Sequence, residues 1–219
     1  MTVTFGRMLA ALFCVAAAPI HLLLCLLIRL CDAGPALYRS QRLGLQGKAF
    51  ELLKYRTMKV NSSPVLAAGF KVVVEASDPR VFRLGKWLRC GIDELPQVWN
   101  VVRGEMAWVG PRPDLPWMLP CYGPITRGRL SALPGITGLA QVMDSRNLPT
   151  FEGYAVDLWY VCHHRFWFDL WIAAVTPLFI AGWHSVGRRR LEELRGSGEF
   201  RRLREACERE LAVAKPSQA

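Results

Sequence analysis

The chain has 219 residues, of which 52% are hydrophobic, and it carries a formal net charge of +10. This length suits one domain with a buried core, and apolar and basic character together suit an anionic membrane surface or a phosphate-rich substrate. The arginines flank apolar runs and do not interleave with aromatic residues as in nucleic-acid-binding segments, so we expect contact with anionic membrane lipids and no nucleic acid. Seven scattered cysteines without a CxxC pair argue against disulfides or zinc and favour a reducing compartment.

The first predicted element is the apolar run Met8–Ile28, which is long enough to cross a bilayer as a helix. Pro19 near its middle removes one backbone hydrogen bond, and His21 needs a polar partner at membrane depth. Arg7 before the run and Arg29 after it are both positive, which keeps both ends in the cytoplasm. A re-entrant helix that kinks at Pro19 and returns accounts for all three observations, and we assign it residues 1–31.

Two other interpretations of this run stay open. A single transmembrane helix, kinked at Pro19, is the simplest alternative. A cleavable signal peptide would use Ala16–Ala18 as its cleavage site, but it would leave Pro19 directly after the cut and a second apolar run behind it.

After residue 31 the pattern becomes globular, and we assign residues 32–186 to one domain. Gly and Pro around short runs at residues 34–60 predict a strand or a hairpin, followed by a short helix. Residues 61–70 are typical of a surface loop. The next segment predicts a short strand, a turn at Asp78-Pro79 and a helix.

Three cations of this domain are candidates for an anion site. Lys54 and Arg56 are two residues apart, so they share one face of a strand. Arg112 lies between Pro111 and Pro113, which restrict its backbone, and its guanidinium suits the oxygens of a phosphate. A solvated surface charge is the alternative for each, but several cations in stiff loops near an acid pair favour an anion site.

That acid pair is Asp93 and Glu94, followed by Pro96 and a helical run. In a structural interpretation Asp93 is the N-cap, Glu94 favours the positive end of the helix, and Pro96 lies in the first turn. In a functional interpretation the same position keeps the carboxylates ionised and directed outward. One could then attack a phosphorus atom while the other holds Mg²⁺. The two interpretations are compatible.

Five segments, in this order, resemble the bacterial sugar transferases, the monotopic polyprenyl-phosphate phosphoglycosyl transferases. They are "GPALYRSQRLGLQGKAFELLKYRTM", "SDPRVFRLGKWLR", "DELPQVWNVVRGEMAWVGPRP", "PGITGLAQV" and "DLWYVCHHRFWFDL". With the N-terminal run they cover roughly residues 8–185. The resemblance implies an enzyme that moves a sugar-1-phosphate from a UDP-sugar to undecaprenyl phosphate and releases UMP, which begins a lipid-linked glycan. It also implies an α-rich α+β monotopic fold on the cytoplasmic face of a bacterial inner membrane, with interfacial amphipathic helices.

The resemblance also implies roles for individual residues. Asp93 would be the nucleophile that forms an aspartyl-phosphosugar intermediate, and Glu94 its partner, with both working with Mg²⁺. Pro19 matches the proline that breaks the family's re-entrant helix. The substrate phosphates and nucleotide would be bound by Lys54, Arg56, Arg89, Arg112, Pro113 and Arg146. Arg89 stands one residue closer to the acid pair than the family's arginine, and the segment around Arg146 is one residue longer, so the sequence does not name the sugar.

The C-terminal third is rich in Trp, Tyr and Phe, which favour the headgroup layer of a membrane. The apolar stretch Leu170–Trp183 is too short to span comfortably and contains Pro177, so it predicts interfacial helices, with a core helix as the alternative. Residues 187–219 predict a basic amphipathic tail interrupted at Gly196–Gly198, with Arg188–Arg190 against anionic headgroups.

Four polar residues in this third carry no assigned chemistry. The adjacent His163 and His164 point apart on a helix, so a polar face is a better interpretation than a metal site. Asp157 and Asp169 match acidic positions of the family and are interpreted as structural.

Two other functions stay open, a Mg²⁺-dependent phosphohydrolase of lipid diphosphates and a non-catalytic membrane scaffold. The sequence does not fix the oligomeric state, and a dimer is one option.

Overall fold

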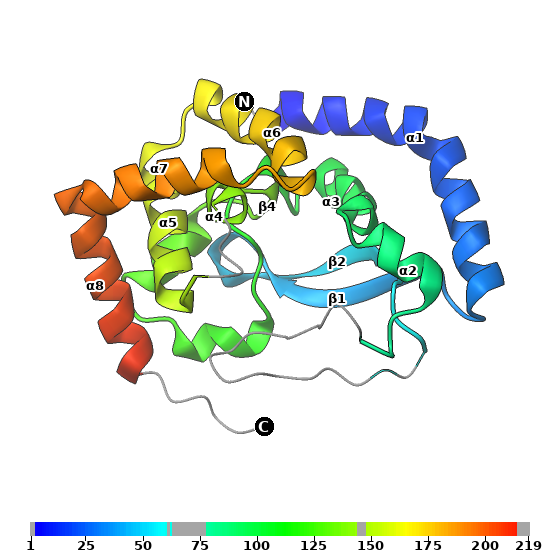
Figure 1. The fold of residues 1–219 in the computed structure, drawn as a ribbon, viewed down its shortest axis with the longest axis horizontal. Coiled ribbons are helices and arrows are strands. Elements are labelled where there is room, and N and C mark those ends of the chain that lie inside the picture. The colour runs from blue at the N-terminus through cyan, green and yellow to red at the C-terminus, as the bar shows by residue number, and fades with distance from the viewer. Residues whose placement is uncertain (1–2, 61, 63–77, 144–147, 214–219) are drawn as a thin grey trace.

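The structure is a computed structural model, and it describes residues 3–60, 62, 78–143 and 148–213 (Figure 1). Its helices are α1 (Val3–Cys31), α2 (Arg83–Leu88), α3 (Gln97–Arg103), α4 (Leu139–Val142), α5 (Thr150–His163), α6 (Phe166–Ile180), α7 (Ser185–Gly196) and α8 (Gly198–Val213). Its strands are β1 (Leu37–Leu43), β2 (Ala49–Tyr55), β3 (Ala107–Val109) and β4 (Gly135–Thr137). The expected helix-rich α+β class with an apolar N-terminal helix is confirmed.

β1 and β2 form the antiparallel hairpin that the sequence predicts, in a register that places Leu37 opposite Tyr55 and Leu43 opposite Ala49. The short helix expected after it is absent from residues 45–60, where a single 3-10 turn, Leu45–Gly47, joins the strands. After β2, residues 56–60 instead form an irregular segment in which Met58 makes an antiparallel bridge with Val81. Side chains alternate between the two faces of the hairpin, and this alternation decides which of them reach the site.

β3 and β4 are short parallel strands that pair Ala107 with Gly135 and Val109 with Thr137. Their pairing brings the "GPRP" loop after β3 beside the "PGITG" segment. A Cβ atom on Gly135 would lie 2.1 Å from the backbone nitrogen of Gly110, so this close approach of two backbones requires glycine.

α1 packs on the globular part at both of its ends. Near its start, Arg7 Nε donates to the Val102 carbonyl at 2.9 Å and Trp108 Nε1 donates to the Gly6 carbonyl at 2.9 Å. Beyond its last turn, Arg56 forms an ion pair with Asp32 at 2.9 Å. Figure 1 shows a change of direction part-way along this helix, which contains Pro19, the residue type that most often bends helices.

Most of the large side chains of α1 point away from the protein and are exposed. Within the described ranges, α1 is the one helix long and apolar enough to cross a membrane, by length and composition only.

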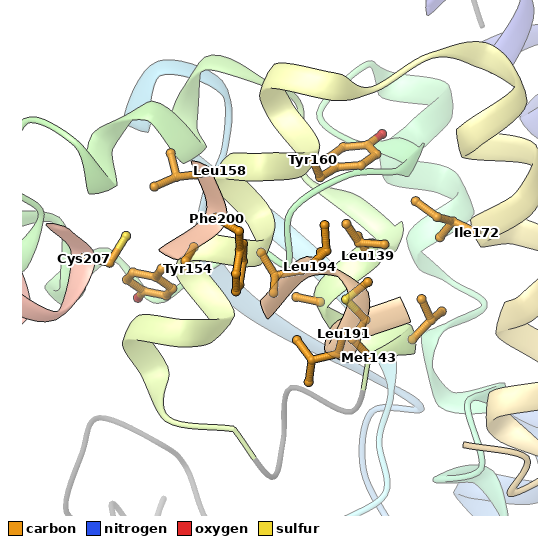
Figure 2. Close-up of a cluster of buried hydrophobic side chains, with 14 of the residues drawn as sticks. Leu139, Met143, Tyr154, Leu158, Tyr160, Ile172, Leu191, Leu194, Phe200 and Cys207 are labelled. Carbon is orange, nitrogen blue, oxygen red and sulfur yellow. The ribbon is translucent and has the colours of Figure 1, made fainter. Parts of the chain in front are cut away.

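The main core surrounds α5: α4 and α8 pack against this helix, α6 packs on α4, and α7 packs on α8 (Figure 2). Leu139, Ile172 and Phe200 are fully buried in it and come from three different helices. The interruption expected near Gly196–Gly198 is present, because α7 ends at Gly196 and α8 begins at Gly198. Both helices contribute buried side chains to this core, so residues 187–213 are packed on the same body as α5.

Replacing Phe200 by alanine should destabilise the protein by about 3–5 kcal/mol, because the ring is fully buried and its loss leaves a cavity. Thermal or denaturant unfolding in detergent measures this. The control is Val213→Ala at the exposed end of the same helix, which should change stability by less than about 0.5 kcal/mol. Equal effects of the two substitutions would contradict the docking of α8 on α5.

Candidate active site

The acid pair lies in a short 3-10 turn, Ile92–Glu94, that precedes α3. Gly91 before it has a φ of 115°, and Pro96 occupies the cap position of α3. The expectation that Asp93 caps the helix is therefore wrong: the helix begins three residues beyond the pair, and neither cap position shows a side-chain capping bond. The tight turn leaves both carboxylates available to groups from outside the helix.

Glu94 is held by two cations from other parts of the chain. Its Oε1 atom accepts a hydrogen bond from Lys54 Nζ on β2, and lies 3.2 Å from an Nη2 atom of Arg112 in the loop after β3. Burial alone would raise the pKa of Glu94, but Arg112 and Lys54 outweigh it and lower this pKa from 4.5 to about 2. Glu94 is therefore an anion throughout the neutral range.

Asp93 differs from its neighbour in its surroundings. It forms no ion pair and no hydrogen bond to another side chain of the described residues. Burial, and then the charge of Glu94, raise its pKa above the ordinary value of 3.8, while Lys54 and Arg89 act in the opposite direction. A partly buried carboxylate with a raised pKa and free oxygens is more basic than a solvated one, so it suits attack on an electrophile.

Arg112 owes its position to a buried ionic network beneath its loop. Arg129, which is 4% exposed, donates from Nη2 to the Arg112 carbonyl at 3.1 Å and pairs with Asp157 at 2.6 Å. Its other amino group pairs with Asp114, which also accepts a hydrogen bond from Tyr154 at 2.7 Å. These bonds hold the carbonyl of Arg112 and the carboxylate of Asp114, the two residues on either side of Pro113.

The two acidic residues interpreted as structural have structural partners. Asp157 is buried against Arg129, and burial, partly offset by that arginine, raises the pKa of Asp157 to about 6. Asp169 accepts a hydrogen bond from the Tyr160 hydroxyl at 2.6 Å. Neither carboxylate lies with the acid pair.

The structure separates the predicted phosphate-binding residues into three groups. Lys54 and Arg112 converge on Glu94, with Pro113 next to Arg112 in the chain. Arg89 donates to Thr57 Oγ1 at 3.2 Å and exerts its charge on Asp93. The third group is Arg56, which pairs with Asp32.

Arg56 follows β2 but does not share the surroundings of Lys54. Its guanidinium is 6% exposed, pairs with Asp32, and donates to the carbonyls of Asp32 and Ala33 beyond the end of α1. The strand ends at Tyr55, so the alternation that would have aligned the two cations does not extend to Arg56. Arg146 lies outside the described residues.

Arg42 is a cation beside the acid pair that the sequence analysis did not select. It lies on β1, and the charges that act on it include those of Arg112, Asp114 and Glu94. The signal that could have identified it is the hairpin register, which places Tyr38 opposite Lys54 and therefore puts Arg42, four residues along the strand, on the same face.

The fit of the acid pair to Mg²⁺ rests on donor chemistry. Mg²⁺ is commonly held by one or two carboxylates together with substrate phosphates. Asp93 has no side-chain partner among the described residues, and Glu94 uses only Oε1 for its two cations, so the pair fits this donor set. Within the described part of the chain no group of three or more His, Cys, Asp or Glu residues could hold a metal ion by itself. His163 is stacked on Trp159 and bonded to its carbonyl, as a packed polar-face residue would be.

A hollow of about 560 Å³ opens on the opposite face of the hairpin, between α1, α3 and the strands. Leu53 and Tyr55 of β2 line it, whereas Lys54 points to the acid pair. The hollow is mainly apolar, and Leu95 and Pro96, which directly follow the acid pair in the chain, also line it.

Comparison with known proteins gives a consistent result. The family model described as bacterial sugar transferase matches residues 1–182. The exopolysaccharide production protein ExoY of Sinorhizobium fredii is 35% identical over 185 residues, which cover 79% of this chain and 82% of ExoY. The UDP-glucose:undecaprenyl-phosphate glucose-1-phosphate transferase of Caulobacter vibrioides is 41% identical over 186 residues, covering 80% of this chain and 66% of that protein.

The UDP-galactose-lipid carrier transferase of Erwinia amylovora is 38% identical over 157 residues, covering 66% of this chain. The chain spans about a third of the length of that relative, 33%, so the shared part is one segment of a longer protein.

Replacing Arg112 by glutamine should raise the pKa of Glu94 from about 2 towards its ordinary 4.5, because a cation that favours the carboxylate is removed. In the unchanged protein, the stabilisation from ionised Glu94 is present above pH 4.5 and is lost as the pH falls towards 2. Carboxyl chemical shifts of isotope-labelled glutamate, followed by NMR against pH, measure both effects. Arg103→Gln, whose arginine lies 3.8 Å from Glu105, is the control and should leave the Glu94 titration unchanged. An unchanged titration in Arg112→Gln would contradict the assigned pairing.

Proposed function

The chain belongs to the bacterial sugar transferase family, and from this premise we propose that it transfers a sugar-1-phosphate from a UDP-sugar to undecaprenyl phosphate and releases UMP. The observation that carries the proposal is the position of Asp93, whose carboxylate has no side-chain partner among the described residues, beside an ionised Glu94 between Lys54 and Arg112. The printed functions of the Caulobacter and Erwinia relatives support the substrate classes. The product would initiate a lipid-linked glycan, and the name of ExoY supports an exopolysaccharide.

In the first step an oxygen of Asp93 attacks the β-phosphorus of the UDP-sugar. The new bond joins that oxygen to phosphorus, the bond from this phosphorus to the bridging oxygen breaks, and the bridging oxygen leaves with UMP. In the second step an oxygen of the lipid phosphate attacks the same phosphorus, the Asp93–phosphorus bond breaks, and the carboxylate is regenerated. The products are UMP and a polyprenyl diphosphate sugar, with no net proton required at Asp93.

Glu94 acts in this scheme as an anion that positions cations. Because its pKa is about 2, it cannot supply a proton at neutral pH. It holds Lys54 and Arg112 at one point beside Asp93, where both can stabilise the charge of the transferring phosphoryl group. Arg89, whose charge lowers the pKa of Asp93, would help to keep the nucleophile ionised.

We assign Mg²⁺ to this reaction, held by Asp93 and Glu94 together with substrate phosphates. When bound it would neutralise part of the phosphate charge. We also propose that Arg56 and Arg146 help to bind the substrate phosphates and nucleotide, as the family resemblance implies. The bonds of Arg56 to the end of α1 favour a part in holding β2 against that helix.

We propose that α1 enters and leaves the membrane on the same side. A straight helix of 29 residues would be about 44 Å long and would separate its ends by more than the hydrocarbon core. Here Gly6 and Arg7 contact residues 102 and 108, while Asp32 contacts Arg56 in the same body. Both ends therefore lie on one globular unit, which we place on the cytoplasmic face of the inner membrane.

The interfacial part of the proposal rests on α6 and α7. α6 is apolar, and its Trp167 and the following Trp183 are largely exposed, as headgroup-layer residues are. Arg188 and Arg189 at the start of α7 are exposed and suit anionic lipids.

Two alternatives make different predictions. A Mg²⁺-dependent phosphohydrolase of lipid diphosphates would release phosphate without a UDP-sugar and would form no UMP. A non-catalytic scaffold, or a dimer that acts only through its surface, would keep its function in Asp93→Asn.

Asp93→Asn should lower UMP release by ~10⁴-fold or more, because the amide is a far weaker nucleophile than the carboxylate. Membranes that contain the protein are incubated with Mg²⁺, undecaprenyl phosphate and a panel of UDP-sugars, and UMP is measured. A chelator in excess should abolish release in the unchanged protein. Glu208→Gln on the exposed surface of α8 is the control and should keep full activity. No UMP from any UDP-sugar, or a covalent adduct on a residue other than Asp93, would refute the proposal.

The position of α1 predicts that Thr4→Cys in its first turn and Pro35→Cys just beyond its end react from the same side of the membrane. The exposed Cys31, Cys90 and Cys162 are first changed to serine. A membrane-impermeant maleimide should label neither position in intact spheroplasts and both after permeabilisation. Labelling of one position alone in intact spheroplasts would show a helix that crosses the bilayer.

A further inference from the structure

One face of the β1–β2 hairpin forms a wall of the candidate active site. Tyr38 lies directly opposite Lys54 in the register, and Lys54 binds Glu94. Arg42 is four residues from Tyr38 on the same strand, so its side chain leaves the same face. Tyr38, Lys54 and Arg42 therefore form one row beside Glu94.

Arg42 is a cation with no partner in the part of the chain that the structure describes. Its Nε atom is buried without a hydrogen-bond partner, and its guanidinium takes part in no ion pair with the described residues. Burial, and then the neighbouring charge of Arg112, lower its pKa. An unsatisfied buried cation is costly, and an anion between the two guanidinium groups would compensate both.

Arg42 also differs from the other partly or fully buried arginines around the site. Arg56 is bonded to the residues after α1, and Arg129 is bonded to two carboxylates. These two stabilise the protein itself, whereas the donors of Arg42 remain available for a ligand.

Tyr38 supplies a flat surface at the other end of the row. Its side chain is 52% exposed, and Lys54 lies directly opposite it on β2. Tyr38 and Arg42 are four residues apart on β1, so the ring and the guanidinium leave the same face of the hairpin. An exposed ring of this kind is a platform on which a nucleobase can stack.

We propose that Arg42 binds the diphosphate of the nucleotide donor and that Tyr38 stacks on its base. The inference rests on the proposed function and assigns the donor half of that site to one face of the hairpin. A nucleoside diphosphate joins two phosphates to a planar base and so matches the row of two cations and an aromatic ring. The lipid acceptor offers one phosphate and no planar group, so it would leave Tyr38 unused.

The same strand provides a matched control. Arg39 lies between Tyr38 and Arg42 in β1, but it points to the opposite face, where it pairs with Glu51 at 3.2 Å and lines the apolar hollow. Arg39 and Arg42 are thus the same residue type on the same strand, with their side chains on opposite faces. Arg39→Met should therefore leave nucleotide binding unchanged.

The test is direct binding of UDP and of inorganic pyrophosphate, each in the presence of Mg²⁺, to the full chain in detergent. Arg42→Met should raise the dissociation constants of both ligands about tenfold to hundredfold, as expected for loss of a charge-assisted contact. Tyr38→Leu should raise the constant for UDP about tenfold and leave that for pyrophosphate unchanged, while Tyr38→Phe should behave as the unchanged protein.

Stability separates a binding role from a structural one. Because Arg42 has no protein partner, Arg42→Met should keep or raise the unfolding temperature, whereas a structural arginine would lower it. Unchanged constants in Arg42→Met, or equal losses in Arg39→Met, would overturn the assignment of Arg42. If Tyr38→Leu weakens binding to anionic vesicles and leaves UDP binding intact, the ring is a membrane anchor and its assignment is overturned.

Failure of this inference is distinguishable from failure of the proposed function. UDP binding requires neither a sugar nor an acceptor, so it is measured independently of turnover. UDP binding that depends on Arg42, without UMP release from any UDP-sugar, would refute the transferase and retain the nucleotide site. UMP release by the unchanged protein, together with unaltered UDP binding in Arg42→Met, would retain the transferase and refute the nucleotide site.

Discussion

The position of Glu94 between Lys54 and Arg112 is the interaction on which the rest of the site depends. It joins three segments that are distant in sequence: strand β2, the turn before α3 and the loop after β3. Each of the two bonds is modest in energy. Because Lys54 and Arg112 bind the same carboxylate oxygen, the position of one cation restricts the position of the other. Loss of either leaves a partly buried anion with half of its compensation, which costs more than an exposed ion pair would.

Support for this centre extends inward from Arg112. The side chain of Arg112 is 51% exposed and pairs with Glu94, while its backbone is anchored through the carbonyl that accepts a hydrogen bond from Arg129. Arg129 in turn is buried between Asp114 and Asp157, on helices and loops that belong to the main core. Packing of α5, α7 and α8 thus reaches the acid pair through one buried guanidinium, and a core defect near Asp157 should be felt at Arg112.

The sequence predicted the elements better than the partners. Hairpin β1–β2, the break between α7 and α8 and the acid pair followed from local patterns of Gly, Pro and charge. The cap role of Asp93 did not hold, because Gly91 at a φ of 115° turns the chain early and Pro96 takes the cap position. The different surroundings of Arg56 and Arg42 could not be read from spacing, because they depend on where the strand ends and on which distant groups face each side chain.

The two adjacent carboxylates divide their labour because their surroundings move their pKa values in opposite directions. Two cations lower the pKa of Glu94 to about 2, while burial, with the charge of Glu94 added, raises the pKa of Asp93. The anion that binds the cations therefore makes its neighbour more basic without taking its hydrogen bonds. A nucleophile must be ionised yet poorly solvated, and the charges of Lys54 and Arg89 lower the pKa of Asp93 against the effect of its burial. If both carboxylates were fully solvated, Asp93 would be ionised but a weaker nucleophile. If no cations lay nearby, the two carboxylates would have shared a proton.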